Sequence, residues 1–455
     1  MIACLREAAP AKAGGSCPTE LNKLNKLNNP MNPISQKVDL IIKNTSELLT
    51  LSPAFKEESG LGIIRNGALA VKNGKIVWIG KTNELSKSGV LKRNGKEIDA
   101  TGKVVIPGLI DSHTHIVFGG SRENEFEQRL QGLSYLEIAE RGGGILSTVE
   151  ATRKASFEEL FLLGKKRLNR MLSGGVTTIE AKSGYGLSLK DELKILKVMR
   201  DLDEDHPVDI VPTFLGAHTV PKEFKNNRQG YVNLLTEEMI PRIAERKLAE
   251  FCDVFCEEKA FNLEESKKIL ETGKRYGLKP KIHADQLSSG GGAELAAEVG
   301  AYSADHLEYV SPDGIERMAE KGVTATLLPG ASFFLSMKKL PPAREMIEKG
   351  VTIALATDLN PGSSMTESLP LIMTMGCTMF RMLPREVIQA TTIHAAKSMG
   401  RERNIGSLEV GKQADIAIFD IPNYRYLPYH FGVNHVDIVI KKGKVVYQKL
   451  IINEQ

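Results

Sequence analysis

The sequence predicts a (β/α)8 barrel combined with a small β-sandwich domain that both chain ends build. Two observations lead to this prediction. The middle of the chain alternates short apolar runs with amphipathic helical stretches, which is typical of parallel βα units. The two ends instead carry alternating apolar and polar residues broken by turn residues, which favours β-hairpins.

The first 37 residues are predicted to be a disordered extension outside this fold. They lack the continuous apolar stretch of a secretion signal and show no apolar period that could pack. Five basic and two acidic residues give this segment +3 of the formal net charge of +4, so the rest of the chain is nearly neutral. A nearly neutral body without a basic stripe argues against a nucleic-acid partner.

Residues 38–106 and 405–455 are predicted to form one composite β-sandwich domain. Both segments contain the same kind of hairpin sequence, "NGKIVWIG" near the start and "KGKVVYQK" near the end. Chain ends of a domain usually lie close together, so a single domain made from both termini is the simplest arrangement.

Residues 107–404 are predicted to form the barrel. Helical stretches such as 157–175, which closes on a glycine C-cap, separate its strands. The eight strands are predicted in the runs "KVVIPGLIDSH" (103–113), "GVTTIEAKS" (175–183), "VDIVPTFLGAH" (208–218), "FCDVFCEE" (251–258), "KPKIHAD" (279–285), "YSADHLE" (302–308), "GVTATLLPG" (322–330) and "VTIALATDLN" (351–360).

Active sites of such barrels lie at the carboxyl ends of the strands, so these ends provide the candidate residues. Five of the nine histidines fall there. The candidates, in strand order, are His113, His115, Tyr185, His218, His283, His306 and Asp358.

A metal site is predicted at the first, fifth and eighth strands. Residues two apart in a strand point to the same side, so His113 and His115 can grip one cation through ring nitrogens. With His283 and Asp358 they make a nitrogen-rich site that suits one zinc (Zn2+) or iron (Fe3+) ion and leaves a position open for water. A lone strand-end histidine is more often a satisfied polar residue, but the combination favours a metal.

The motifs "PGLIDSHTH", "HAD", "DH" and "TD" resemble those of the amidohydrolase superfamily. More narrowly, "GGGILSTV", "EAKSGYGL", "FLGAH", "IHADQLS" and "ATDLNPGSS" resemble the imidazolonepropionase family of histidine degradation, over residues 38–450. The resemblance implies hydrolysis of 4-imidazolone-5-propanoate to N-formimidoyl-L-glutamate. It implies one metal on the four ligands above and substrate contacts from Arg122, Tyr185, His218, Gln286, Asn360, Gly362 and Ser363. Ser363 departs from the family's more usual threonine but keeps the hydroxyl.

Elementary chemistry assigns roles to the same residues. Opening a cyclic amide needs a strong nucleophile, which a metal supplies by lowering the pKa of its water to about 7. Asp358 can take the proton and later pass it to the leaving ring nitrogen. His306 can hold the attacking water or the developing oxyanion, or else be a buried histidine bonded to backbone.

Three loop features each have two interpretations. Arg122 suits a substrate carboxylate, or it is a surface arginine paired with Glu123 or Glu125. Tyr185, between two glycines, is a ligand contact or an ordinary turn aromatic. Residues 141–149, "RGGGILSTV", are predicted to be a mobile lid, the alternative being a helix stop.

The rival function is a deaminase of a small heterocycle such as guanine or cytosine. Deaminases with a similar site carry a glutamate three residues after the histidine of strand five. This chain has Gln286 at that position. Because an amide cannot shuttle a proton, this residue weakens the deaminase interpretation. A second metal would need a carboxylated lysine at the end of strand four, and Lys259 lies beyond that end, so we expect one metal. A non-catalytic scaffold would have no reason to keep this constellation.

The remaining expectations concern compartment and partners. Five scattered cysteines predict no disulfide framework, and a cytoplasmic location follows as the expectation. Cys252 and Cys256 are predicted to be core residues of a buried strand, since no second pair accompanies them to bind a metal.

No apolar run approaches the ~18 residues of a membrane span, so no membrane partner is expected. A small-molecule substrate is expected, and the number of subunits stays open, a homodimer being one option.

Overall fold

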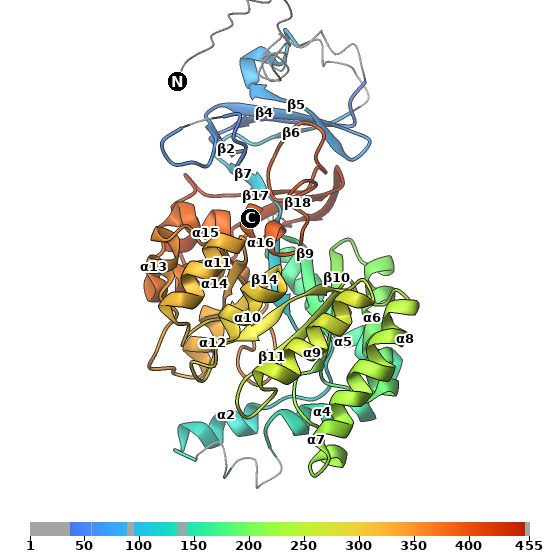
Figure 1. The fold of residues 1–455 in the computed structure, drawn as a ribbon. Helices are drawn as coiled ribbons and strands as arrows, with labels where there is room; N and C mark the ends of the chain where they lie inside the picture. Colours follow the sequence, from blue (N-terminus) through green and yellow to red (C-terminus); the bar gives the residue numbers. More distant parts are fainter. Residues whose placement is uncertain (1–36, 56, 89–94, 134–136, 138–142, 451–455) are drawn as a thin grey trace, which may run out of the picture.

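The computed structural model describes residues 37–55, 57–88, 95–133, 137 and 143–450. The predicted extension lies outside these residues except for Lys37. Figure 1 shows antiparallel strands from both chain ends at one end of the molecule and a helix-wrapped barrel below them. The combination of a parallel barrel with additional antiparallel sheets confirms the predicted fold class.

The barrel strands pair in parallel, and each lies within one of the eight predicted runs, except that β8 extends one residue beyond the first run, to Thr114. The barrel closes where the backbone N–H of Asp358 donates to His113 at 3.0 Å and that of His115 donates to Leu359 at 2.9 Å. Closure therefore brings the first and eighth strand ends together at the metal-binding candidates. The strands are β8 (Leu109–Thr114), β9 (Val176–Lys182), β10 (Asp209–Ala217), β11 (Phe251–Cys256), β12 (Lys279–Pro280), β13 (Ile282–Ala284), β14 (Ser303–His306), β15 (Thr324–Leu327) and β16 (Ile353–Leu355).

The first predicted strand, 103–113, is in fact two strands. Its first half, β7 (Val104–Pro107), pairs antiparallel with a strand from the C-terminal part of the chain, and only β8 enters the barrel. The break falls at Gly108, where a Cβ atom would lie 2.4 Å from the side chain of Thr177. Only glycine fits this close approach, so the chain passes there from one sheet to the other.

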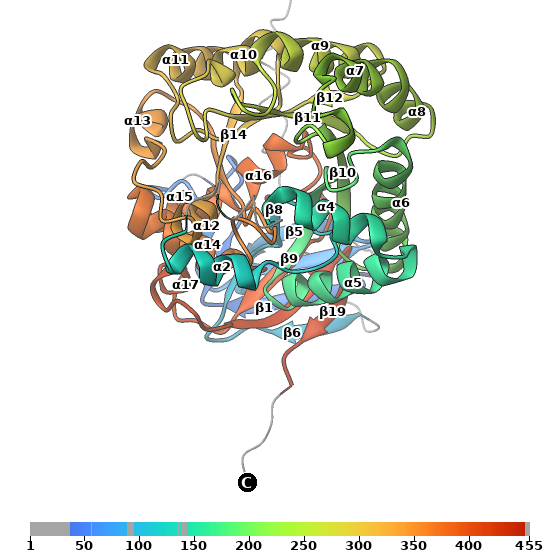
Figure 2. The same cartoon turned by 90° about the horizontal axis from the view of Figure 1, so that it is seen from below.

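Helices surround the barrel, and α2 and α4 lie across its end opposite the antiparallel sheets (Figures 1 and 2). The predicted glycine cap holds, since Gly174 is the C-cap of α5 and Ser156 caps its other end. No helix in the described ranges is long and apolar enough to cross a membrane. The helices are α2 (Glu123–Leu130), α4 (Ile145–Lys154), α5 (Phe157–Ser173), α6 (Leu189–Asp205), α7 (Arg228–Asn233), α8 (Ile240–Glu245), α9 (Leu263–Arg275), α10 (Gly292–Val299), α11 (Pro312–Lys321), α12 (Pro329–Phe334), α13 (Ala343–Glu348), α14 (Leu369–Phe380), α15 (Pro384–Ala390), α16 (Ile393–Ser398) and α17 (Tyr426–Tyr429).

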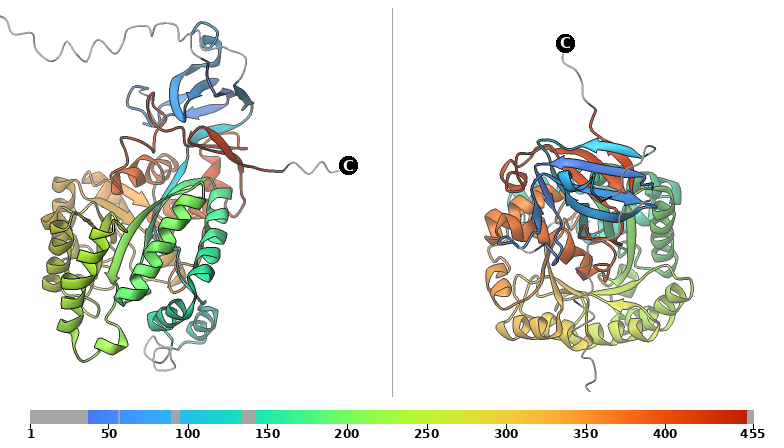
Figure 3. Two further views of the ribbon diagram at one scale, coloured as in Figure 1. Left: turned by 90° about the vertical axis from the view of Figure 1, so that its right-hand side faces the viewer. Right: turned by 90° about the horizontal axis from the view of Figure 1, so that it is seen from above.

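Two sheets form the β domain, and Figure 3 shows them stacked on the barrel. The six-stranded sheet joins both chain ends because β7 pairs with β17. Residues of both sheets, such as Leu40, Ile42, Ile416 and Ile440, share one buried apolar cluster. The sheets run β5-β4-β1-β6 and β19-β18-β17-β7-β2-β3, with strands β1 (Leu40–Thr45), β2 (Glu47–Leu49), β3 (Ile63–Ile64), β4 (Gly67–Lys72), β5 (Lys75–Lys81), β6 (Lys96–Asp99), β17 (Ile416–Phe419), β18 (Val436–Lys441) and β19 (Lys444–Gln448).

Candidate active site

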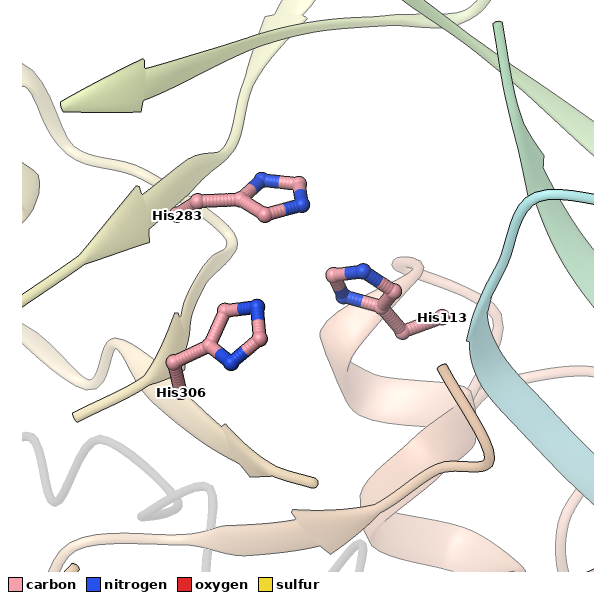
Figure 4. Close-up of side chains that lie close together, drawn as sticks. All are labelled: His113, His283 and His306. Atoms are coloured by element: carbon pink, nitrogen blue, oxygen red, sulfur yellow. The ribbon is translucent and has the colours of Figure 1, made fainter. Parts of the chain in front are cut away.

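The predicted histidines converge at the carboxyl ends of the barrel strands. His113 and His115 come from β8, His283 from β13 and His306 from β14, and all four are buried. The ring centres of His113 and His283 lie 4.6 Å apart, and those of His283 and His306 lie 5.4 Å apart. Figure 4 shows these three rings facing one another from separate strands. The strand-end prediction therefore brings together side chains that are far apart in the sequence.

Two groups of potential metal ligands overlap where these histidines meet, and within each group the ligand atoms lie within 4.8 Å of one another. One group is His113, His115 and Asp358, with Asp358 Oδ1 lying 3.4 Å from His113 Nε2 and 3.7 Å from His115 Nε2. The other group is His113, His283 and His306, so His306 lies within ligand reach as well. All four predicted ligands belong to one of the two groups, which share His113.

Hydrogen bonds at the far side of two rings leave their other nitrogens free for a metal. Nδ1 of His113 lies 2.7 Å from Asp305, and Nδ1 of His283 lies 3.2 Å from Asp253. Nε2 of each ring is buried and has no hydrogen-bond partner among the described residues. A carboxylate behind a ligating histidine is the usual arrangement in metal sites. The orphaned nitrogens and the nearby carboxylate of Asp358 therefore fit a bound cation.

The electrostatics of the site favour neutral imidazoles. Burial lowers the pKa of His113, His115 and His306 well below the usual value, and it lowers the pKa of His218 to about 3. Metal ligation requires the deprotonated ring, so these rings are ready to bind without losing a proton first. Burial also raises the pKa of Asp358 to about 7.

The backbone at two of these residues adopts an uncommon conformation. His306 has a φ of 81° and Asp358 a φ of 52°, in the left-handed region that residues other than glycine rarely occupy. Backbone strain of this kind concentrates at functional sites.

Tyr185 and His218 lie beside the metal-binding candidates. Tyr185 is buried, and its ring centre is 5.5 Å from that of His115, whereas His218 stacks on His115 at 5.2 Å. The carboxylate of Glu192 accepts the backbone N–H groups of Gly184, Gly186 and Leu187, which fixes the turn that carries Tyr185. Tyr185 is thus held in the site and is not an ordinary turn residue at the surface.

Arg122 combines features of both interpretations. Its Nε and Nη2 atoms bond Glu125 Oε2 at 2.9 and 2.7 Å, so the ion pair with Glu125 exists. Its side chain is nevertheless only 14% exposed. Its Nη1 atom lies against Gly362, where an added Cβ would come within 2.3 Å of it. Arg122 therefore bridges the loop after β8 and the loop after β16.

The loop after β16 is organised by its own side chains. Asn360 Oδ1 accepts the N–H groups of Gly362 and Ser363, each at 2.8 Å. The hydroxyl of Ser363 donates to Asp358 Oδ2 at 3.1 Å. This contact helps to hold the carboxylate of Asp358 in place, so the hydroxyl that Ser363 retains has a structural role. Gln286, 8% exposed, lies just beyond β13.

The structure also describes the lysine beyond strand four, the two strand cysteines and part of the predicted lid. Lys259 is exposed in the turn beyond β11, whereas the metal-binding candidates are buried. Cys252 and Cys256 are buried free thiols, and none of the candidate metal clusters in the described parts of the chain contains a cysteine. The predicted lid, 141–149, is described only from residue 143 onward, where α4 begins after Gly144.

Comparison with known proteins identifies the family of this chain. The amidohydrolase family matches residues 104–446. An imidazolonepropionase of Geobacillus sp. (strain WCH70) is 55% identical over 414 residues, which cover 90% of this chain and 97% of the relative. One of Shouchella clausii (strain KSM-K16) is 52% identical over 424 residues, covering 91% and 94%.

The chain belongs to the imidazolonepropionase family of amidohydrolases. Solved structures with lower sequence identity share the fold. A triazine hydrolase from Arthobacter aurescens has a TM-score of 0.70 at 16% identity, covering 90% of this chain and 95% of the other. An adenosine deaminase from Xanthomonas campestris with bound zinc has a TM-score of 0.68 at 17% identity, covering 90% and 93%.

The sequence pattern did not predict the charged residues behind the candidate metal-binding histidines. These residues are Asp253, Asp305 and Lys182, and all three are fully buried. A signal was present, since Glu180 and Lys182 stand two apart in the apolar run "VTTIEAKS" and must face the same side. Two charges at that spacing in a buried strand indicate a paired polar interior.

Proposed function

We propose that this chain opens the ring of 4-imidazolone-5-propanoate to give N-formimidoyl-L-glutamate, using one zinc or iron ion held by His113, His115, His283 and Asp358. The proposal rests above all on the unpartnered Nε2 atoms of His113 and His283 beside the buried carboxylate of Asp358, in a chain of this family. The metal, when bound, activates water at neutral pH and polarises the amide carbonyl.

The protein's own residues supply the remaining steps. Asp358, oriented by Ser363, accepts the proton of the attacking water and returns it to the ring nitrogen that leaves. His306 has a buried Nδ1 without a hydrogen-bond partner in the described structure, so its ring is free to hold the water or the developing oxyanion. Tyr185, His218 and Gln286 lie around the ring of the substrate.

The propionate arm of the substrate sets the specificity. Its carboxylate enters a site that already contains Asp358, so it needs a cation, and Arg122 is beside the loop that carries Gly362. Glu125 holds one edge of the guanidinium and leaves Nη1 to face that loop. Recognition through this atom distinguishes the substrate from other small cyclic amides.

The choice of substrate distinguishes the proposed ring-opening activity from that of a deaminase. Because the amide of Gln286 cannot relay a proton, we expect the protein to consume 4-imidazolone-5-propanoate and to ignore guanine and cytosine. The loss of the ring's ultraviolet absorbance follows the first reaction, and ammonia release follows the other two. Ammonia from either base at a comparable rate would assign the chain to deamination.

Gly362→Ala is expected to weaken substrate binding without unfolding the protein. The new methyl group would lie 2.3 Å from Arg122 Nη1, and Glu125 restrains the guanidinium from moving aside. We expect KM to rise about tenfold, equivalent to ~1.4 kcal/mol. Gly290→Ala is the control because its nearest neighbour would be 3.9 Å away. A Gly362→Ala enzyme with the KM of the unaltered protein would show that Arg122 does not contact the substrate.

A further inference from the structure

Glu308 is a buried carboxylate near the strand ends of the barrel, outside the predicted set of site residues. It lies two residues beyond the end of β14, and its side chain is fully buried. One carboxylate oxygen, Oε1, accepts the hydroxyl of Ser332 at 3.0 Å. The other, Oε2, is buried and has no hydrogen-bond partner among the residues that the structure describes. A buried acceptor without a partner is costly, so Oε2 is a candidate ligand-binding atom.

The surroundings of Glu308 place it on the side of the barrel mouth that carries Asp358. Ser332 lies in α12, the short helix that follows β15. At Gly330 of the same helix, an added Cβ would lie 2.5 Å from Ser364 Oγ, in the loop after β16 that also contains Asp358. Glu308 is therefore packed among segments that follow the carboxyl ends of neighbouring strands, where barrel enzymes bind their substrates.

Two carboxylates whose charges act on Glu308 have other partners. Glu257 Oε1 accepts the N–H of Leu287 at 2.7 Å, and its Oε2 accepts the hydroxyl of Ser288 at 2.6 Å. Asp358 belongs to the proposed metal ligands. Burial, and to a smaller extent repulsion from Asp358 and Glu257, raises the pKa of Glu308 to about 8. A cation beside Oε2 would relieve this unfavourable environment.

Ring opening creates a cation that suits such an oxygen. The bond between the carbonyl carbon and the ring nitrogen breaks, and water supplies a hydroxyl to the carbon and a hydrogen to the nitrogen. The products are a carboxylic acid and a formamidine, which is a strong base and takes the proton of the acid. The neutral ring thus becomes a carboxylate and a planar formamidinium with several N–H donors. Carboxylates pair well with planar cations of this kind.

We propose that Glu308 binds the formamidine end of the opened ring through Oε2 and stabilises the positive charge that develops there. The ring of the substrate is neutral, so this contact becomes stronger as the C–N bond breaks, which is the condition for lowering the barrier. The hydroxyl of Ser332 holds the carboxylate from its other oxygen. This role rests on the proposed function, because it requires that the ring be opened.

The experiment compares the binding of two ligands to the metal-loaded protein by isothermal titration calorimetry. N-formimidoyl-L-glutamate carries the formamidinium, and N-formyl-L-glutamate has nearly the same shape with a neutral formyl group in its place. The unaltered protein is expected to bind the charged ligand at least about tenfold more tightly, as one hydrogen bond between charged groups allows. Glu308→Gln keeps the size of the side chain without its charge, so it should bind both ligands with nearly equal affinity.

Turnover gives a second measurement, which a purely structural role would not change in the same way. Glu308→Gln is expected to lose about 10–100-fold in kcat for ring opening while KM changes by less than about threefold, because the charge acts only as the ring opens. Its metal content, from elemental analysis, should equal that of the unaltered protein.

Glu257→Gln is the matched control. It also removes the charge of a buried carboxylate near the strand ends, but both oxygens of Glu257 already have partners within the protein. This variant is expected to keep the preference for the charged ligand.

Loss of the preference and of kcat in Glu308→Gln alone supports the proposal. Equal affinities in the unaltered protein, an undiminished preference or kcat in Glu308→Gln, or the same loss of preference in Glu257→Gln overturns it. If Glu308→Gln does not fold, Glu308→Asp decides, because it keeps the charge and withdraws it by one methylene group: a reduced preference supports the contact, and an unchanged preference contradicts it. Failure of the proposed function is distinguishable, since the unaltered protein would then leave 4-imidazolone-5-propanoate intact, which overturns both.

Discussion

His115→Ala is expected to purify with far less than one metal per chain and to show no measurable ring opening. His115 is one of two buried histidines whose Nε2 atoms approach the carboxylate of Asp358, its own at 3.7 Å. Residues that only orient a ligand contribute about 10–100-fold to metal affinity, so the loss of a ligand is expected to exceed that range. Elemental analysis and the absorbance assay measure the two effects.

His430→Ala is the control for the histidine variant. His430 is exposed at the end of α17, where its ring contacts Tyr426 and His435, far from the barrel strand ends in the sequence. It should keep a full complement of metal and full activity. Full metal content in His115→Ala would remove His115 from the ligand set and leave His113, His283 and His306 as the group that binds the ion.

Arg122→Met is expected to keep its metal and its fold but to lose at least about thirtyfold in kcat/KM, equivalent to ~2 kcal/mol. The cause is the substrate's carboxylate, which would be buried near Asp358 without a cation, at a cost of roughly 2–5 kcal/mol. Removal of the guanidinium also frees Glu125, which adds a second negative group to the entrance. Steady-state kinetics with 4-imidazolone-5-propanoate measures the loss.

Two controls accompany Arg122→Met. Arg129, on the helix α2 that begins directly after Arg122, lies over the rings of Phe126 and Phe334, and Arg129→Met should leave kcat/KM unchanged. An imidazolone without the carboxylate should be processed equally poorly by the unaltered protein and by Arg122→Met. If Arg122→Met instead turns over the full substrate at the normal rate, Arg122 serves only its ion pair with Glu125.

The barrel could be predicted because parallel strands buried on both faces leave continuous apolar runs in the sequence. The candidate site residues at the strand ends could be predicted for the same reason, since His113, His283 and Asp358 stand at the ends of such runs. The break at Gly108 could not be seen, because "KVVIPGLIDSH" reads as one run. It becomes visible only when Thr177, on the neighbouring strand, shows why no side chain fits there.

The buried charged residues behind the site could not be predicted either, because they lie on different strands. Lys182, Asp253 and Asp305 lie on three strands, and their mutual distances follow from barrel geometry that no local pattern records. Asn360 and Ser363 stay predicted substrate contacts, and the structure adds that their side chains bond within their own loop and to Asp358. Local motifs therefore predict which residues lie at a strand end, whereas the tertiary structure determines which of these residues hydrogen-bond to the others.

The account is tested most directly by removing the metal and returning it one equivalent at a time while ring opening is followed by ultraviolet absorbance. Metal-free protein is expected to leave 4-imidazolone-5-propanoate intact. Activity should return in proportion to added Zn2+ or iron and reach its limit at one equivalent per chain. Ring opening at the normal rate by the metal-free protein, or no ring opening at any metal content, would contradict the account.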